Sequence, residues 1–235
     1  MDNARNESWS KSSENEPQVW VAWSGGKDSA LTLLRLRRHG IPIAGLLSTV
    51  VGSPPTVPFH GIPAATLRQH AQALGVPLVL LRFRHPPSDR LYARRLRACL
   101  RQLGCRALAF GDIFLEDVRR FREEILAPLA LHLLFPLWGT DSRALADEVL
   151  GSGVRAVITC VDVRFLPRDW LGREYAEDFL RAMPPEVDPC GERGEFHTCV
   201  LSMPGFRFSL ALQSSVPVQW AQHWHGYRIT TAVAR

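Results

Sequence analysis

The sequence predicts a doubly wound α/β fold, in which helices cover both faces of a parallel sheet. Over residues 19–161, short apolar segments alternate with helical patterns of about 10–15 residues, the order that βαβ crossovers produce. The apolar segments are nearly continuous, as expected of strands that are buried on both faces. Glycine or proline stands at many of the boundaries.

The first part of this pattern contains two strands and two helices. The segment 19–23, Val-Trp-Val-Ala-Trp, predicts a buried strand, and the apolar spacing of 30–39 predicts a helix that ends before a glycine. A second strand is expected at 43–51. The next helix, 63–74, begins with a proline, which is favoured at the first helical position, and ends at Gly75.

The alternation then continues up to residue 161. Strand patterns occur at 78–83, 106–110, 133–135 and 154–161, and helical patterns at 89–103, 115–126 and 142–150. Near residue 183 the character changes, because prolines and glycines interrupt the pattern. Segments 206–212 and 227–233 alternate apolar and polar residues, as antiparallel strands do. We therefore expect a small C-terminal α+β element beside the parallel layer.

Composition limits the class of protein. Of 235 residues, 46% are hydrophobic and 22% charged, as in an ordinary globular protein. No apolar run reaches the roughly 18 residues of a membrane span, and the polar N-terminus lacks the apolar core of a secretory signal. The five scattered cysteines form no CxxC pair, which suits a reducing compartment. We expect a cytoplasmic protein without a membrane partner, in which residues 1–17 form a disordered tail.

The positions and types of the charged residues are more informative than the net charge. The formal net charge is +5, and the residues after the tail carry +7. Such a surplus attracts polyanions, including nucleotides and RNA, although a solvated helix face is the simpler explanation for arginines at 31–38 and 91–101. Lys27 is the only lysine after the tail. A position that needs a compact ammonium rather than a planar guanidinium explains this choice.

A glycine-rich loop, Ser24–Ser29 (Ser-Gly-Gly-Lys-Asp-Ser), lies between the first strand and the first helix. Its two glycines allow a close approach of the backbone to a phosphate, and the N-terminus of the following helix attracts an anion. The two serines can donate hydrogen bonds, and Lys27 adds charge. Asp28 caps the helix or holds Mg²⁺. The pattern is neither GxxxxGK[ST] nor GxGxxG.

Two further segments carry polar residues where a site is expected. Asp112, Glu116 and Asp117 follow the strand 106–110, and metal coordination and helix capping are equally good explanations for them. The segment 188–198 combines two glutamates, a histidine and a threonine between glycines. It offers acid and base groups on a flexible backbone, with a structural turn as the alternative. Cys190, His197 and Cys199 do not have the spacing of a common zinc site.

Together, these segments resemble the diphthine–ammonia ligase family of the PP-loop superfamily, the N-type ATP pyrophosphatases. The loop Ser24–Ser29 resembles the SGGxD[ST] signature of the superfamily, and the segment 190–198, CGERGEFHT, resembles the C-terminal signature of the family. Gly111-Asp112, Phe135–Trp138 and His60 within Phe-His-Gly also resemble family motifs. The resemblance extends from Val19 to about residue 200.

This resemblance implies that ATP and Mg²⁺ bind and that ATP is cleaved to AMP and pyrophosphate as a carboxylate is adenylated and then amidated. It assigns residues 18–135 to a PP-loop ATP-binding domain and residues 136–235 to a substrate-binding and catalytic part. The expected ATP-binding residues are Ser24, Gly25, Gly26, Lys27, Asp28, Ser29, Gly111 and Asp112, with Mg²⁺ at Asp28. Substrate contacts are expected from His60 and Glu116, and catalytic roles from Glu192, Glu195, His197 and Thr198.

The segments 111–117 and 190–197 depart from the archaeal and eukaryotic pattern and indicate a bacterial-type member. Since bacteria are not expected to make diphthamide, the resemblance implies the fold and the ATP chemistry rather than the acceptor. The acceptor is a small-molecule or protein-side-chain carboxylate, and the second substrate is ammonia or an amine. The oligomeric state is open, with a homodimer as one alternative.

Two other functions stay open. An RNA-modifying PP-loop enzyme fits the basic charge, but the chain has no CxxC cluster or separate RNA-binding domain, so nucleic acid is a less favoured partner. A nucleotide-binding regulator without ligase chemistry is the second alternative. The acidic and histidine side chains of 192–197 argue against it.

Overall fold

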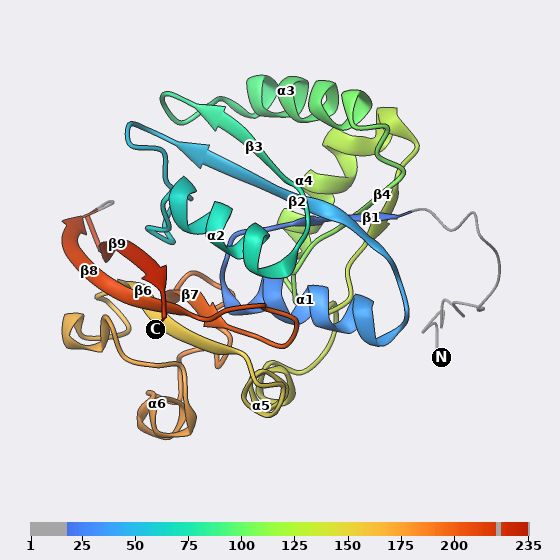
Figure 1. Cartoon of the computed structure of the whole chain (residues 1–235). Helices are drawn as coiled ribbons and strands as arrows, with labels where there is room; N and C mark the ends of the chain where they lie inside the picture. The colour runs from blue at the N-terminus through green and yellow to red at the C-terminus, as the bar shows by residue number, and fades with distance from the viewer. Residues whose placement is uncertain (1–17, 220–221, 235) are drawn as a thin grey trace.

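Five parallel strands form the sheet that carries the glycine-rich loop Ser24–Ser29, which we call the phosphate loop. The computed structural model describes residues 18–219 and 222–234, so the tail expected at 1–17 lies outside the described residues. The strand order is β3-β2-β1-β4-β5 (Figure 1), which confirms the doubly wound parallel sheet. The strands are β1 (Val19–Ala22), β2 (Ile43–Val51), β3 (Leu78–Phe83), β4 (Ala107–Ala109) and β5 (His132–Leu134).

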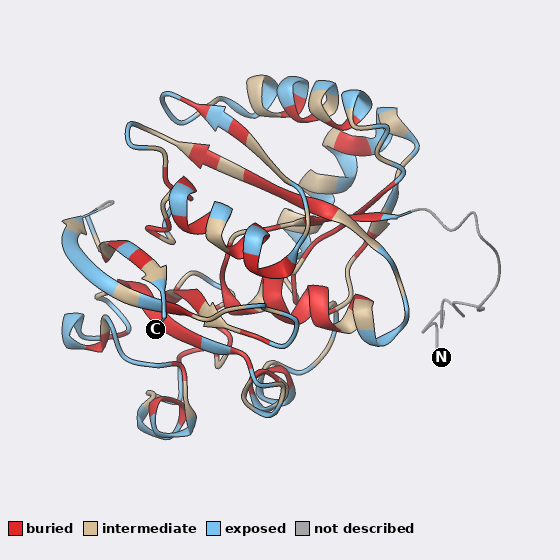
Figure 2. Ribbon diagram, viewed as in Figure 1, coloured by how far each residue is buried: buried red, intermediate tan, exposed pale blue. Residues whose placement is uncertain are grey.

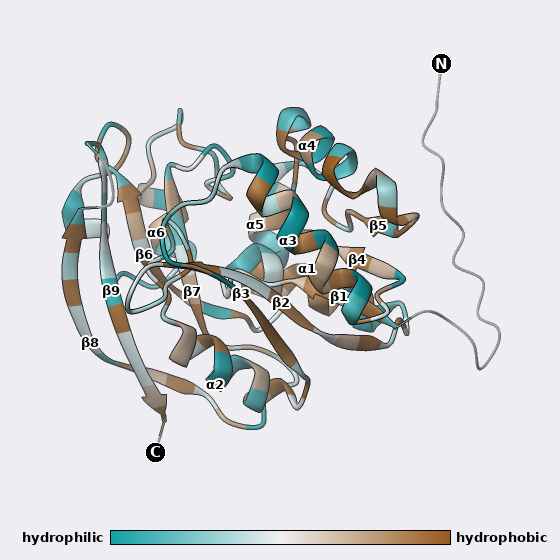
Figure 3. Cartoon of the chain, turned by 90° about the horizontal axis from the view of Figure 1, so that it is seen from above, coloured by the Kyte–Doolittle hydropathy of each residue, from teal (hydrophilic) through white to brown (hydrophobic). Residues whose placement is uncertain are grey.

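Four helices cover the two faces of this sheet. The helices are α1 (Lys27–Arg38), α2 (Ala64–Leu74), α3 (Asp89–Gln102) and α4 (Glu116–Leu126), and a short 3₁₀ turn, Ala127–Leu129, follows α4. Helices α3 and α4 lie on one face and α1 and α2 on the other (Figure 1). Each face has its own apolar cluster, and Trp20 and Leu108 belong to the one under α3. Figure 3 shows the hydrophobic residues along β1 and β4 between the helices.

A second, antiparallel sheet of four strands follows in the chain, in the order β7-β6-β9-β8. The remaining elements are α5 (Ser142–Gly151), β6 (Arg155–Asp162), the 3₁₀ turn Arg168–Trp170, α6 (Glu177–Ala182), β7 (Phe196–Ser202), β8 (Leu210–Gln219) and β9 (Trp224–Val233). The strand expected at 154–161 therefore belongs to the second sheet and not to the parallel one. Its burial on both faces explains why its pattern resembles that of a parallel strand. The outer strand β8 is mostly exposed (Figure 2).

The second sheet packs against α1 and α2, and β7 is bound directly to the phosphate loop. The amide of Val200 donates to the carbonyl oxygen of Gly25 at 2.8 Å. The indole of Trp23 donates to Nδ1 of His70 at 3.3 Å, so that Nε2 of His70 carries the proton and donates to the Val200 oxygen at 2.8 Å. The two sheets thus meet at the end of β1, where the site lies. Among the described helices, none has the length and hydropathy of a membrane span.

Candidate functional site

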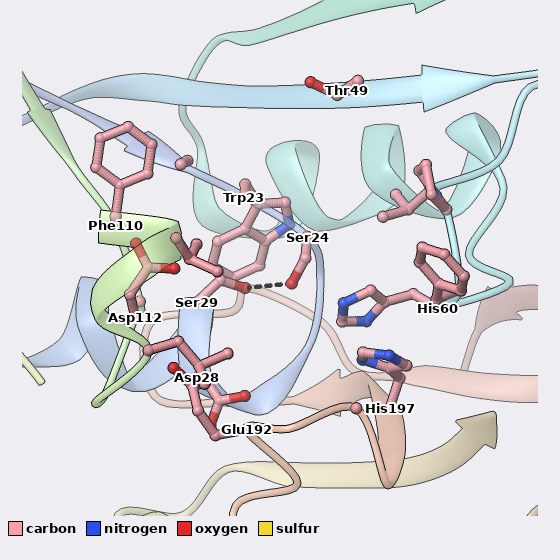
Figure 4. A pocket seen from close by; sticks show the side chains of 18 of the residues that line it. Trp23, Ser24, Asp28, Ser29, Thr49, His60, Phe110, Asp112, Glu192 and His197 are labelled. Atoms are coloured by element: carbon pink, nitrogen blue, oxygen red, sulfur yellow. Dashed lines mark hydrogen bonds between the residues drawn. The ribbon is translucent and has the colours of Figure 1, made fainter. Parts of the chain in front are cut away.

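A pocket of about 640 Å³ opens where β1, β2 and β4 end, and residues 191–198 close its other side. This edge, at the carboxyl ends of the strands, is where doubly wound sheets bind ligands. Ten of the residues predicted for the site line the pocket: Ser24, Lys27, Asp28, Ser29, His60, Gly111, Asp112, Glu192, His197 and Thr198. Figure 4 shows Asp28, Asp112 and Glu192 on one side and the two histidines on the other.

The phosphate loop has a tightly determined backbone. Gly25 has φ +83°, and a side chain added there would contact His70 at 3.1 Å, so glycine is required on both grounds. The hydroxyl of Ser24 accepts from the Gly26 amide at 3.1 Å, and that of Ser29 donates to the Gly26 oxygen at 2.8 Å. Gly25 and Gly26 therefore shape the floor of the pocket without lining it.

Thr198 closes the N-terminus of α1 from outside the helix. The N-cap residue, Gly26, has no side chain to offer, and Thr198 Oγ1 on β7 instead accepts from the Lys27 amide at 3.0 Å. This satisfies one of the amide groups that a helix leaves free at its start. The amides of Asp28 and Ser29, in the same first turn, retain the orientation that favours an anion.

Lys27 points toward residues 188–195, which we call the C-terminal loop, rather than into open space. Its side chain is 2% exposed, and its amine donates to both carboxylate oxygens of Asp28 at 3.0 Å and to the Cys190 carbonyl oxygen. The amine also lies 5.3 Å from the ring of Tyr175 and 5.1 Å from that of Phe196. Burial, the largest single influence, lowers the pKa of Lys27, but the attraction of and hydrogen bond to Asp28, together with Cys190 and Asp188, outweigh burial and raise the pKa. Lys27 is therefore a cation at neutral pH.

Asp112 is buried and paired with a residue that the sequence did not indicate. Arg122 on α4 donates to its two carboxylate oxygens at 2.5 and 2.9 Å and stacks over Phe110 at 4.4 Å. Leu115, Val118 and Arg122 share one face of α4 and line the pocket, a spacing that could have indicated Arg122. Glu116, by contrast, is exposed in the first turn of α4 and lies outside the pocket.

Glu192 bridges the C-terminal loop and the β4–α4 loop. Its carboxylate accepts from the amide of Ile113 at 2.8 Å and, more weakly, from that of Phe114 at 3.5 Å. Burial raises the pKa of Glu192 to about 7, and the charges of Asp28 and Asp112 act in the same direction. This carboxyl group therefore changes charge near neutral pH.

Glu195 lies outside the pocket although it belongs to the same loop. Gly191 and Gly194 have positive φ angles of 66° and 93° and turn the chain, so that Glu195 enters the interior at the start of β7. Its Oε1 accepts from the Asp188 amide at 3.1 Å and lies 3.6 Å from the Arg193 guanidinium, and its Oε2 has no partner among the described residues. These contacts of the buried Glu195 hold the C-terminal loop in place from the protein interior.

His60 and His197 form a neutral aromatic wall. Their ring centroids are 4.4 Å apart, and Nδ1 of His60 donates to the Thr198 oxygen at 3.2 Å. Burial lowers the pKa of His60 to about 4 and that of His197 well below its usual value, and Lys27 lowers both further. His197 therefore does not have the ordinary pKa of about 6.5 that a proton relay near neutral pH would use. Phe59 and Trp224, which the sequence did not indicate, extend this wall.

The pocket combines an apolar wall with a polar phosphate loop. Leu47, Leu96, Leu108, Phe110 and Tyr92 supply an apolar wall for a base, while the phosphate loop supplies hydroxyls and the start of α1. Asp28 is the one carboxylate of the phosphate loop, and 28% of its side chain is exposed. The described residues contain no cluster of three or more metal-binding side chains. A cation at Asp28 would therefore take its other ligands from phosphates and water, as Mg²⁺ commonly does.

The sheet, the loop and the pocket define a PP-loop type of nucleotide-binding α/β protein. Two family models match the chain: "Diphthamide synthase N-terminal domain" over residues 17–132 and "Diphthamide synthase C-terminal domain" over residues 141–234. The chain belongs to the diphthamide synthase family.

Curated relatives agree with this membership. A diphthine–ammonia ligase from Danio rerio is 27% identical in an alignment of 220 residues that covers 83% of this chain and 86% of that protein. The corresponding human protein is also 27% identical, over 82% of this chain and 81% of its own length. The Schizosaccharomyces pombe diphthine–ammonia ligase is 32% identical over 48% of this chain, and the match spans only 19% of that longer protein.

One solved structure shows a distant likeness. A predicted subunit of tRNA methyltransferase from Methanocaldococcus jannaschii is 20% identical over 60% of this chain and 77% of that chain, with a TM-score of 0.41. No conclusion about function rests on a likeness of this degree.

Proposed function

We propose that this protein is an ATP-dependent amide ligase that cleaves ATP to AMP and pyrophosphate, adenylates a carboxylate and transfers it to ammonia. The observation that carries the proposal is the junction of the two sheets. The phosphate loop and the segment 191–198, the two parts of the chain that resemble the family signatures, face one another across a single pocket. Family membership over most of the chain supports the same chemistry.

The residues of the α/β part account for the ATP side of the reaction. The base lies against the apolar wall, and the phosphates lie at the amides of α1, Ser24 and Ser29. Asp28 would hold Mg²⁺, which would stabilise the charge that develops on the leaving pyrophosphate, and the guanidinium of Arg122, held in place by Asp112, would add positive charge at the pocket. In this arrangement residues 18–135 bind ATP, with Gly111 and Asp112 at its edge.

The residues of the C-terminal part act on the acceptor side. The acceptor carboxylate attacks the α-phosphorus and pyrophosphate leaves. The nitrogen of ammonia then attacks the acyl carbon, and AMP leaves with the carboxylate oxygen. Glu192 takes the proton that the nitrogen loses, because its carboxylate faces the pocket and ionises near pH 7. The neutral His60 and His197 bind the acceptor. In this proposal residues 136–235 form the substrate-binding part, to which His60 of the ATP-binding part contributes, and the reaction takes place in the cytoplasm.

Isotope transfer tests the ligase proposal. The protein is incubated with ATP, Mg²⁺, ¹⁵N-ammonium and a small-molecule or protein fraction of cell extract, and products are analysed by mass spectrometry. The proposal predicts a ¹⁵N-amide that forms in a one-to-one ratio with AMP and that disappears with Glu192→Gln. AMP formation without any ¹⁵N product would limit the proposal to ATP cleavage, and the absence of both would refute it.

A further inference from the structure

The positive charge of this protein is concentrated in one segment. Residues 78–106, which comprise β3 and α3, contain eight arginines and a single acidic residue, Asp89, and so carry a net charge of +7. The whole chain carries +5, so all other residues together sum to −2. The basic character of the protein is therefore a property of one element pair and not of the surface in general.

Four of these eight arginines lie along one side of α3. Strand β3 is an edge strand, and α3 lies on the outer face of the sheet beside it (Figure 1). Arg90, Arg94, Arg97 and Arg101 recur at the spacing of a single helix stripe, and three of them are exposed while Arg97 is half-buried. Figure 3 shows this helix with hydrophilic residues along its surface. We call this stripe of four arginines on α3 the arginine face.

Among the described residues, the arginine face forms no ion pairs with acidic side chains. Within the described part of the chain, none of the eight arginines of residues 78–106 forms a salt bridge. Other exposed arginines do, such as Arg155 with Glu174 at 2.8 Å and Arg181 with Glu177 at 2.6 Å. The usual explanation of a charged helix, mutual neutralisation with nearby acids, therefore does not apply here.

The face also lacks the features of a protein interface. Such interfaces are anchored by aromatic and aliphatic side chains, with few charged residues at the centre. The large hydrophobic side chains that are exposed in the described residues are Phe59, Phe165, Val216 and Val233, and none belongs to β3 or α3. Nucleic-acid interfaces are instead polar and strongly positive, and the guanidinium fork matches a phosphate group.

We propose that the arginine face binds the sugar–phosphate backbone of a nucleic acid, most directly a single-stranded or looped RNA. The opposite side of the same helix carries Tyr92 and Leu96, which line the nucleotide pocket. A strand bound along α3 therefore lies beside the pocket, one helix diameter from its wall. The proposal concerns binding alone and does not depend on the ligase chemistry.

Two triple variants with equal net charge test this proposal. One replaces Arg94, Arg97 and Arg101 with glutamine. The control replaces Arg143, Arg155 and Arg181, which are exposed on other elements and paired with acids. Each loses three positive charges, so the two have the same net charge and differ in where the charges were removed. The probe is a fluorescent 20-nucleotide single-stranded RNA of mixed sequence, titrated at 50, 100 and 200 mM salt, with unfolding curves and ATP affinity measured in parallel.

The wild type is expected to bind RNA with a steep salt dependence, since each phosphate contact to a single strand contributes a slope of about −0.7 in log K against log salt. Loss of three contacts should reduce the slope by about 2 and weaken binding on the order of 100-fold at 100 mM salt. The control should lose much less, and ATP affinity should not change in either variant.

Three outcomes would overturn the proposal. The first is a wild-type protein that does not bind the RNA at 50 mM salt. The second is an equal loss in the two variants, which would attribute binding to net charge alone. The third is polyglutamate of similar length binding as tightly as the RNA, which would make the arginine face a site for an acidic protein.

Discussion

At the scale of single residues, burial decides which pocket groups are charged. It raises the pKa of Glu192 to about 7 and lowers that of His60 to about 4. Between these two values Glu192 holds a proton and His60 does not. The pocket therefore gains one negative charge, on Glu192, as the pH rises through 7.

The raised pKa of Glu192 has a consequence for stability. The unfolded carboxyl has a pKa of about 4.3, so between that value and about 7 the folded state holds the proton that the unfolded state has lost. The free energy of unfolding therefore falls as the pH rises through this window. Glu192→Gln removes the effect while keeping an oxygen for the Ile113 amide. From pH 5 to pH 8, the variant should gain about 2–3 kcal/mol relative to the wild type.

Urea unfolding at the two pH values measures this gain. Glu124→Gln, at an exposed position on α4, is the control and should show no such relative gain. If the free-energy difference between Glu192→Gln and the wild type stays constant from pH 5 to pH 8, the carboxyl group does not ionise near neutral pH in the folded protein.

Lys27 provides a second prediction at this scale. Its amine ties Asp28 and the Cys190 oxygen together, so Lys27→Met should release the loop 188–195 and leave a partly buried carboxylate without its partner. We expect a loss of about 3 kcal/mol in the free energy of unfolding and faster tryptic cleavage after Arg193, whose side chain is 60% exposed. Peptide mass spectrometry over time measures the cleavage.

Ser29→Ala is the matched control for this prediction, because Ser29 belongs to the same phosphate loop and does not contact the C-terminal loop. It should leave cleavage after Arg193 unchanged. If Lys27→Met is cut no faster than the wild type, the amine does not hold the loop in place.

The sequence indicated the phosphate loop but not these tertiary partners. The loop was predictable because its glycines, serines and position between a strand and a helix are local features. Two contacts around the loop are made by residues distant in the sequence. The Cys190 oxygen that binds Lys27 is a backbone atom 163 residues away, and Arg122 is recognisable only through its pairing with Asp112. The expected role of Lys27 at a phosphate and that of Glu195 in catalysis stay predictions.

At the scale of elements, a residue of strand β7 caps the N-terminus of helix α1. The strand was not predicted, because His197, Thr198 and Ser202 interrupt its apolar pattern and its first residues belong to a glycine-rich motif. The parallel strands, by contrast, were predictable from continuous apolar runs. Strand β6 has such a run as well, and only its partners β7 and β9 reveal that it belongs to an antiparallel sheet.

Thr198 is the residue through which β7 stabilises α1. Thr198→Val keeps the shape of the side chain but leaves the Lys27 amide without an acceptor. We expect a loss of about 1–2 kcal/mol in the free energy of unfolding, comparable to the loss of a helix cap. Thr198→Ser, which keeps the hydroxyl, should retain most of this stability. Thermal and denaturant unfolding of both variants measure the difference, and equal stabilities would show that the hydroxyl does not cap the helix.

At the scale of the whole molecule, the pocket exists because two sheets meet at one edge. The parallel sheet supplies the phosphate loop and the apolar wall, and the antiparallel sheet supplies Thr198, His197 and the loop that carries Glu192. Neither part alone encloses the pocket. This arrangement explains why both halves of the chain match the same family.

The products of ATP cleavage show which phosphate bond the protein breaks. ATP labelled at the α-phosphate and, separately, at the γ-phosphate is incubated with the protein, Mg²⁺, ammonium and cell extract, with Asp28→Ala as the control. We expect label from the α position in AMP and label from the γ position in pyrophosphate, both dependent on Asp28. Label from the α position in ADP and from the γ position in inorganic phosphate, formed by the wild type and lost in Asp28→Ala, would contradict it.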